Sequence, residues 1–469
     1  MSKQPARSAK EERKHLLDLV HAPDDPAVAR AYADWLDGFG DATAELIRLR
    51  LERAGLDAAD PRRAEIDRRE AKILEDPKIR EYTMAGEDVF AFALRRLGAR
   101  VEVHPDRRPR EIWLKAELIS TGSLGRLAAY PTLLRLRADE HVLTPEELAA
   151  VARLAQIESL SIERTGLTDE ALAAIGGMTG LKSLNIGYNP ISGEGLAHLS
   201  KLSNLEVLDV ASCDPPTPKE KEDDLRDSSW MVHLKAFPRL KALDVAYNRL
   251  AGDGLLHLAG LTEMETLEIH GNRFGDAAFA GLASMTKLRY LSIESNPITA
   301  EGFAHLRGRT SLQVLRFDHA SVGDAGAAVL GTLSGLKELD FGHPKLPMTD
   351  AGAAHLRGLT SIEDLELEDH RLTDAALAAF EGLDALENLD LSGNAGITGP
   401  GLVHLARLPK LVSLDLSRTK VSDRALPQLK ALTVLESLSL HQAKVGERGL
   451  EQLRKALPNA SVSGSKADY

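Results

Sequence analysis

Carboxylates recur at one position of a repeating segment, and they are the side chains of this chain best suited to bind a partner. The position is the second x of segments with the form x-L-x-L. Its occupants are Asp209, Asp244, Glu268, Ser292, Arg316, Asp340, Glu366, Asp390 and Asp415. Like charges that face each other on adjacent strands destabilise a sheet by about 0.2–1 kcal/mol per pair. Two interpretations stay open: an acidic habit of the repeat, or a stripe that binds a basic partner.

Several residues depart from that habit and therefore carry more information about binding. Glu268 and Glu366 replace the usual aspartate, and Arg316 is the lone base of the row. Glu294 and Asp318 stand beside the same segments. Aromatic anchors of the kind that interfaces favour are Tyr188, Tyr247 and Tyr290. We predict that these side chains and the carboxylate row contact a protein partner.

A second group combines imidazoles with carboxylates and could hold a metal ion. Its members are His270, Glu294, Asp318, His319, His343 and Glu368. The ligands would come from an open sheet that excludes little water, so we expect a solvated polar face with neither a metal nor a cofactor. Other histidines recur once per repeat before a leucine, which indicates packing. They are His198, His233, His257, His305, His355 and His404.

Motifs for catalysis are missing from the sequence. It contains no Gly-Lys phosphate loop, no HExxH helix, no EF-hand loop and no G-x-S-x-G turn. Cys213 is the single cysteine, which excludes an intrachain disulfide. An enzyme that uses Cys213 as its nucleophile is one hypothesis, but its place in the repeat favours a buried structural role. We predict no catalytic residue.

The elements that position these side chains repeat every 24 residues. One period is LKSLNIGYNPISGEGLAHLSKLSN, residues 181–204, in which an alternating strand precedes a short helix. Aligned on the second leucine, 14 repeats have it at Ile112, Leu136, Leu160, Leu184, Leu208, Leu243, Leu267, Leu291, Leu315, Leu339, Leu365, Leu389, Leu414 and Leu438. Val462 would mark a clipped fifteenth. Such a unit cannot bury its apolar face alone, so the repeats must stack.

The pattern L-x-x-L-x-L-x-x-N resembles the leucine-rich repeat over about three quarters of the chain. The resemblance implies an α/β horseshoe with a parallel sheet on the concave side, which would carry the carboxylate row, and helices on the convex side. It also implies a column of residues that bond the backbone of neighbouring turns: Thr165, Asn189, Cys213, Asn248, Asn272, Asn296, Asn394 and Thr419. Ala320, Pro344 and Ala443 interrupt this column, which predicts local weakness. Thr168 and Ser192 are expected to cap helices.

A small helical unit precedes the repeats. Asp25-Pro26 predicts a helix start, and Trp35 is expected in a core. The string APDDPAVARAYADWLDGFGDATAELIRLRLE resembles the bacterial repeat-companion domain, a module without an established activity. We predict an all-α module at residues 1–75, a cap or bridge at 76–111, and leucine-rich repeats with a C-terminal cap at 112–469.

Composition narrows the class of partner and the location. The net charge is −12, and residues 1–110 carry equal numbers of acidic and basic side chains, so the negative charge belongs to the repeats. An acidic surface repels phosphate backbones, which disfavours nucleic acid. No apolar run approaches the roughly 20 residues that cross a bilayer. The N-terminal residues lack an apolar leader, and the chain lacks paired cysteines, which favours the cytoplasm. A Pro-rich insertion at 214–230 is either a binding loop or a surface excursion.

These features predict a monomeric, non-catalytic scaffold. It would recognise a protein, a basic one on charge grounds, through its concave acidic face. The alternative is a regulator or adaptor of another enzyme, similar to GTPase-activating leucine-rich-repeat proteins or to ligase adaptors. In that case the N-terminal module would be a second docking site.

Overall fold

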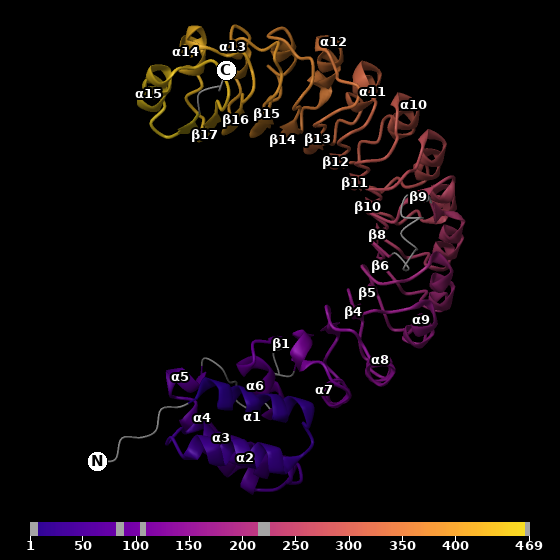
Figure 1. Ribbon diagram of the computed structural model, residues 1–469, viewed down its shortest axis with the longest axis vertical. Helices are drawn as coiled ribbons and strands as arrows, with labels where there is room; N and C mark the ends of the chain where they lie inside the picture. Colours follow the sequence, from indigo (N-terminus) through magenta and orange to yellow (C-terminus); the bar gives the residue numbers. More distant parts are fainter. Residues whose placement is uncertain (1–7, 81–88, 104–108, 214–225, 465–469) are drawn as a thin grey trace. The chain divides into compact units, whose positions relative to one another are not determined.

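The computed structural model describes residues 8–80, 89–103, 109–213 and 226–464 (Figure 1). They form two compact units. Unit 1 comprises Met1–Asp209 and Cys213–Pro216, and unit 2 comprises Val210–Ser212 and Thr217–Tyr469. Most of the predicted insertion loop, residues 214–225, lies outside the described residues. The predicted boundaries at residues 75 and 111 stay predictions, because this division runs through the repeats.

Unit 1 begins with helices whose ends follow local signals. They are α1 (Ala9–His21), α2 (Pro26–Asp37), α3 (Thr43–Ala54), α4 (Arg62–Ile73), α5 (Pro77–Arg80) and α6 (Val89–Arg96). Asp25 caps α2 as predicted, because its Oδ1 accepts the Ala27 N–H at 2.8 Å. The core of these helices includes Leu16, Tyr32, Leu36, Leu46 and Ile47. Trp35 is only half-buried and packs against Phe39 with ring centroids 4.9 Å apart.

The repeats of unit 1 add a sheet to these helices. Its strands run in the order β1 (Arg100–Val103), β2 (Pro109–Trp113), β3 (Arg135–Arg137), β4 (Ser159–Ser161), β5 (Ser183–Asn185) and β6 (Val207–Asp209). Strand β1 is antiparallel to β2 and all later pairs are parallel. The helical segments are η1 (Ala116–Leu118), α7 (Thr121–Leu127), α8 (Pro145–Ala152), α9 (Asp169–Ile175) and η2 (Gly193–Leu199). An antiparallel strand therefore covers the first parallel strand.

Unit 2 continues the same pattern. Its parallel strands follow the order β8 (Ala242–Asp244), β10 (Thr266–Glu268), β11 (Tyr290–Ser292), β12 (Val314–Arg316), β13 (Glu338–Asp340), β14 (Asp364–Glu366), β15 (Asn388–Asp390), β16 (Ser413–Asp415), β17 (Ser437–Ser439) and β18 (Ser461–Ser463). A short second sheet pairs β7 (Arg226–Asp227) with β9 (Leu250–Ala251). Within this unit the strands line the inner side of an arc and the helices its outer side (Figure 1).

The outer segments of unit 2 are short, and many are 3-10 helices. They are η4 (Ser229–Ala236), η5 (Gly254–Gly260), η6 (Asp276–Leu282), α10 (Ala300–Phe303), η7 (Ala304–Leu306), α11 (Gly323–Leu330), α12 (Asp350–Ala353), η8 (Ala354–Gly358), η9 (Ala376–Ala379), α13 (Leu402–Leu405), η10 (Asp423–Ala425), α14 (Leu426–Leu429) and α15 (Glu447–Ala456). No helix in the described ranges is long and apolar enough to cross a membrane.

The register confirms the leucine-rich-repeat solenoid. Second-column residues pair directly with one another along the sheet, as Leu365 does with Leu389, and Leu438 pairs with Val462 of the clipped last repeat. These residues are buried, so the sheet and the helical segments enclose one apolar layer. The predicted α/β fold, parallel sheet inside and helices outside, is therefore correct.

The backbone-bonding column is confirmed and gains one member. Asn272 Nδ2 donates to Val245 O and Ile269 O, and its Oδ1 accepts the Leu250 N–H, all at 2.9 Å. His370 occupies the same position in its repeat and is buried. Its Nδ1 accepts the Met348 N–H at 2.9 Å, and its Nε2 donates to Phe341 O at 2.8 Å. An imidazole thus replaces the usual amide.

Two smaller expectations were only partly right. Thr168 and Ser192 occupy the N-cap positions of α9 and η2, as predicted, but neither makes a side-chain cap hydrogen bond. Instead Ser192 donates its N–H and hydroxyl to Asp169 of the preceding repeat, at 2.8 and 2.6 Å. The six histidines that recur before a leucine are exposed or half-buried, so they do not pack in the core. The predicted weakness at Ala320, Pro344 and Ala443 stays a prediction.

Candidate functional site

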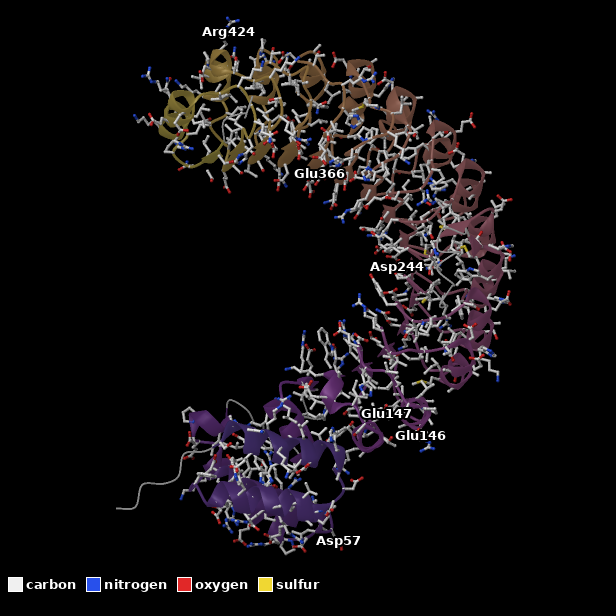
Figure 2. The ribbon with its side chains drawn as sticks, viewed as in Figure 1. Asp57, Glu146, Glu147, Asp244, Glu366 and Arg424 are labelled. Atoms are coloured by element: carbon white, nitrogen blue, oxygen red, sulfur yellow. The ribbon has the colours of Figure 1, made fainter. Side chains whose placement is uncertain are left out.

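The predicted carboxylate row lies on the inner side of the sheet in unit 2. Figure 2 shows Asp244 and Glu366 on that side and Arg424 on the outer side. Strand side chains alternate between faces, so the residues before and after each central leucine share the inner face. Of the predicted binding residues, Asp209 and Tyr188 belong to unit 1 and the others belong to unit 2.

Six carboxylates gather on neighbouring strands and turns of unit 2, and we call them the acidic cluster. They are Asp318, Asp340, Asp364, Glu366, Glu368 and Asp390. Asp340 pairs in register with Glu366, which pairs with Asp390. The Gly342 N–H donates to Asp318 at 2.9 Å and lies 3.4 Å from Asp340. Two carboxyls therefore compete for one donor.

Burial and like charge perturb the acidic cluster strongly. Burial raises the pKa of Asp340 to about 8, and a hydrogen bond with Asp318 and the charges of Asp318 and Glu366 add to the effect. Burial, followed by repulsion between carboxylates, also raises the pKa of Asp364 and Glu366. The pKa values of Glu368 and Asp390 are raised mainly by burial as well. The surroundings of these five carboxyls therefore disfavour their charged forms.

The lone base of the row relieves this charge only in part, because its charge lowers the pKa of Asp364 but leaves it above the usual value. Arg316 donates to Glu338 Oε1 through Nε at 2.8 Å and Nη2 at 2.5 Å, so one carboxylate already neutralises it. Its guanidinium also lies 5.9 Å from the Tyr290 ring centroid. Glu338 and Asp364 were missed by sequence reasoning. The signal was available, because the position before each central leucine shares the inner face with the position after it.

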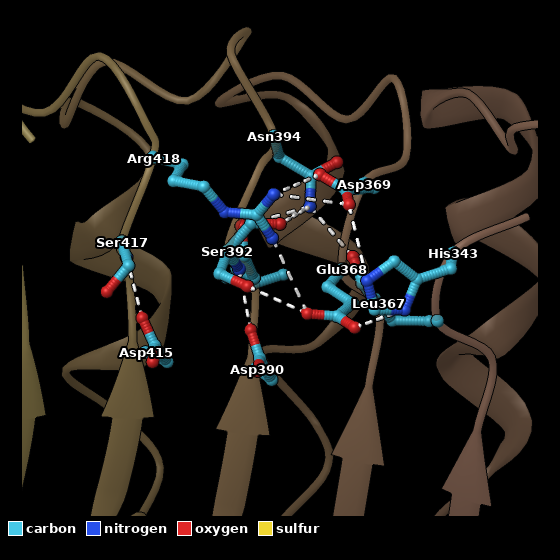
Figure 3. A network of polar contacts seen from close by, with 12 residues as sticks. His343, Leu367, Glu368, Asp369, Asp390, Ser392, Asn394, Asp415, Ser417 and Arg418 are labelled. Carbon is cyan, nitrogen blue, oxygen red and sulfur yellow. Dashed lines mark hydrogen bonds and ion pairs between the residues drawn. The ribbon is translucent and has the colours of Figure 1, made fainter. Parts of the chain in front are cut away.

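A polar network at one border of the acidic cluster holds the turns together (Figure 3). His343 Nδ1 lies 2.6 Å from Glu368 Oε1. Arg418 pairs with Asp369 at 3.1 Å and lies 3.6 Å from Glu368. Ser392 Oγ donates to Glu368 at 3.3 Å. The sequence analysis also missed the ion pair of Asp369 with Arg418. These residues belong to the repeats of β14 and β16, and the repeat of β15 lies between them in the sequence.

Only part of the predicted metal group comes together. His343 lies near Glu368 and 4.0 Å from Asp318 Oδ2. His270 instead meets Ser292 Oγ at 3.1 Å and Glu268 at 3.9 Å. Across the described ranges, no group of three or more His, Cys, Asp or Glu residues could hold a metal ion. The imidazole of His343 is better described as a hydrogen-bonding neighbour of the carboxylates.

The three predicted tyrosines differ in their surroundings. Tyr247 is 57% exposed and meets the His270 ring edge-on, with centroids 4.8 Å apart. Tyr290 is half-buried, and burial raises its pKa. Tyr188 lies in unit 1 beneath the guanidinium of Arg164, 4.1 Å from the ring centroid. Each tyrosine therefore has a different kind of neighbour.

The single cysteine has the structural surroundings that its place in the repeat predicts. Cys213 is buried, and its Sγ lies 3.4 Å from Ile186 O.

The two remaining predicted carboxylates, Asp415 and Glu294, are half-buried, and Asp415 accepts the Ser417 N–H at 2.6 Å. None of these contacts assembles a nucleophile with a base.

Comparison with known proteins agrees with the fold. A family model described as leucine-rich repeat matches residues 178–200, 284–303 and 386–406. An internalin from Listeria monocytogenes is similar at 18% identity and TM-score 0.52, over 77% of this chain and 87% of that chain. A leucine-rich-repeat protein of Leptospira interrogans is similar at 16% identity and TM-score 0.43, over 72% of this chain and 98% of that chain. The structure of PEPR1 with AtPEP1 is similar at 18% identity and TM-score 0.47, over 78% of this chain and 50% of that chain. No curated protein matches the chain.

Proposed function

We propose that this leucine-rich-repeat solenoid is a non-catalytic recognition scaffold that binds a basic segment of a partner protein on the acidic cluster. Stacked repeats expose long concave surfaces, and leucine-rich-repeat proteins generally mediate protein–protein interaction. The proposal includes a monomer in the cytoplasm and no nucleic-acid partner. The observation that carries it is the row of carboxylates on neighbouring strands, in register from Asp340 through Glu366 to Asp390, and burial raises their pKa values.

The raised pKa values make a cationic partner favourable. A lysine or arginine beside Asp340 and Glu366 would favour their charged forms and so offset the burial and the repulsion that raise their pKa values. Binding should therefore release protons near neutral pH. Carboxylates that already pair with lysine or arginine side chains of the same chain would release no protons on binding.

The test uses a ten-residue polylysine peptide and the full chain, with titration calorimetry at pH 7. We expect Glu366→Lys to weaken binding by roughly tenfold or more, since it puts a like charge at the centre of the surface. The matched control is Glu451→Lys, because Glu451 is exposed on α15. Titrations in two buffers of different ionisation enthalpy should show net proton release. Equal affinity for wild type and Glu366→Lys would remove the acidic cluster from the proposal.

The adaptor alternative is supported by a cavity in unit 1. It has a volume of about 430 Å³, and its lining includes Asp25, Arg30, Leu51 and Phe90. Helix α1 also packs on α6 and α7, and Arg13 pairs with Glu117 at 2.7 Å. Deletion of the module would therefore uncover the repeats. Arg30→Glu is the better test: an adaptor loses one of two partners, whereas a plain scaffold keeps its partner.

A further inference from the structure

The inner face of unit 1 differs in character from the acidic cluster. Arg100 on β1, Trp113 on β2 and Arg137 on β3 are direct neighbours across the strands. Both guanidiniums lie against the indole ring, at 4.4 Å for Arg100 and 5.2 Å for Arg137 from its centroid. These distances are within the range of a favourable cation–π contact. The result is an ordered Arg–Trp–Arg row.

Two further arginines extend this face. Arg135 on β3 stands two residues before Arg137, on the same side of the sheet. Arg164 lies over the ring of Tyr188, 4.1 Å from its centroid. We call the six residues the arginine–aromatic face: Arg100, Trp113, Arg135, Arg137, Arg164 and Tyr188. Arginine, tryptophan and tyrosine are the side chains that dominate protein interfaces energetically.

Carboxylates lie beneath these guanidiniums and hold them in place. The Arg137 side chain is 47% exposed, whereas its partner Asp139 is 9% exposed. Arg135 is 58% exposed over Glu111 at 12%, and Arg164 is 49% exposed over Glu163 at 17%. Arg135, Arg137 and Arg164 therefore project beyond these three carboxylates, whereas Arg100 pairs with Glu102, which is itself 47% exposed. Asp139 is itself fixed, since it accepts bonds from Ser161 Oγ at 2.7 Å and from the Glu163 N–H at 2.9 Å.

We propose that the arginine–aromatic face is a second docking surface, and that it binds an acidic polypeptide segment of a partner protein. Guanidinium groups recognise carboxylates through paired N–H donors, and Arg137 uses Nε for Asp139, which leaves its Nη hydrogens for a ligand. The half-buried Trp113 supplies an apolar platform between two cations. Preorganised arginines lose little freedom on binding, which favours affinity.

A polypeptide fits this face better than a nucleic acid does. Two exposed carboxylates pair with arginines of this face: Glu140, at 70% exposure, lies 3.6 Å from Arg164, and Glu102, at 47% exposure, pairs with Arg100. A nucleic acid carries a charge on every nucleotide and would meet these carboxylates as well as the arginines. A peptide can place single carboxylates over the guanidiniums and keep uncharged residues elsewhere. The proposal is independent of the acidic cluster, since all residues of this face lie in unit 1.

The test measures, by fluorescence anisotropy, how a fluorescein-labelled ten-residue peptide in which glutamate alternates with serine binds to the full chain. We expect Arg137→Gln and Arg135→Gln each to weaken binding by roughly tenfold. The second variant protects the test against misfolding, because Arg135 touches Glu111 only at 3.4 Å. Arg424→Gln is the control of equal charge change on the outer side of unit 2 (Figure 2), and it should bind as wild type does.

Four results would overturn the proposal. The first is no binding of the glutamate–serine peptide by the wild type, and the second is an equal loss in the Arg424→Gln control. The third is tighter binding of a labelled ten-nucleotide oligouridylate that Arg137→Gln abolishes. The fourth is self-association of the wild type in sedimentation that Arg137→Gln abolishes. The third would assign the face to RNA, and the last would assign it to a second copy of this chain. Failure here leaves the polylysine test of the acidic cluster unaffected.

Discussion

Replacement of Asp340 by asparagine should remove much of the pH dependence of stability near neutral pH. The pKa of Asp340 rises from 3.8 to about 8 in the folded chain. Between these values the folded state keeps a proton that the unfolded chain has released, so stability falls as pH rises. Each pH unit costs at most about 1.4 kcal/mol. From pH 6.5 to 8 the loss is therefore at most about 2 kcal/mol.

The amide of the D340N variant resembles the protonated carboxyl, since it can still donate to Asp318 and accept from Gly342. D340N should therefore match the wild type at pH 6.5 and exceed its stability at pH 8. The lower limit of pH 6.5 matters, because buried His370 has a pKa lowered to about 4 and titrates below that pH in the opposite sense.

Urea unfolding followed by circular dichroism at pH 6.5 and 8 measures the difference. The control is Glu451→Gln, which removes an exposed carboxylate on α15. Repeat proteins need not unfold in one step, so the midpoints of variant and wild type are compared at each pH. If D340N and the wild type lose the same stability between the two pH values, the attribution to Asp340 is wrong.

Three further predictions concern the repeats. His370→Ala should lower the free energy of unfolding by about 2–4 kcal/mol in urea titrations, because it leaves the Met348 N–H and a backbone carbonyl buried without partners. Gly393→Ala should cost about 1–3 kcal/mol by the same assay, because Gly393 has φ 72° and a Cβ there would overlap Asp369 Oδ1. Cys213 should react slowly with a thiol reagent in the native chain and fast in urea, since it is buried; rapid native labelling would contradict its structural role.

Much of the fold could be predicted because each repeat contains the same spacing of leucines. Among the described residues, the second-leucine column placed every parallel strand of the large sheet, including the one that contains Val462, but not the short pair of β7 and β9. Helix type could not be predicted in the same way. Contacts between neighbouring repeats hold short segments such as η5 in the 3-10 form. Helix propensity has little influence over so few residues.

The candidate site was predicted less completely. The row of carboxylates was found, but its partners were not. Arg316 was identified as the lone base of the row, but its partner, Glu338 of the next strand, was not. Tyr188 was grouped with the acidic residues, yet it lies against Arg164 in unit 1. These contacts join residues 22 to 24 positions apart, so neither partner is visible in the local sequence.

The sequence by itself determined which residues face inward, because period and alternation assign every side chain to the core, the inner face or the outer face. It also determined that the inner face is rich in carboxylates. Only the tertiary structure decided which of these charges are desolvated, which are paired, and that arginines cover the acids in unit 1. Those properties depend on distances between stacked repeats, and Coulomb and desolvation energies change steeply with distance and burial.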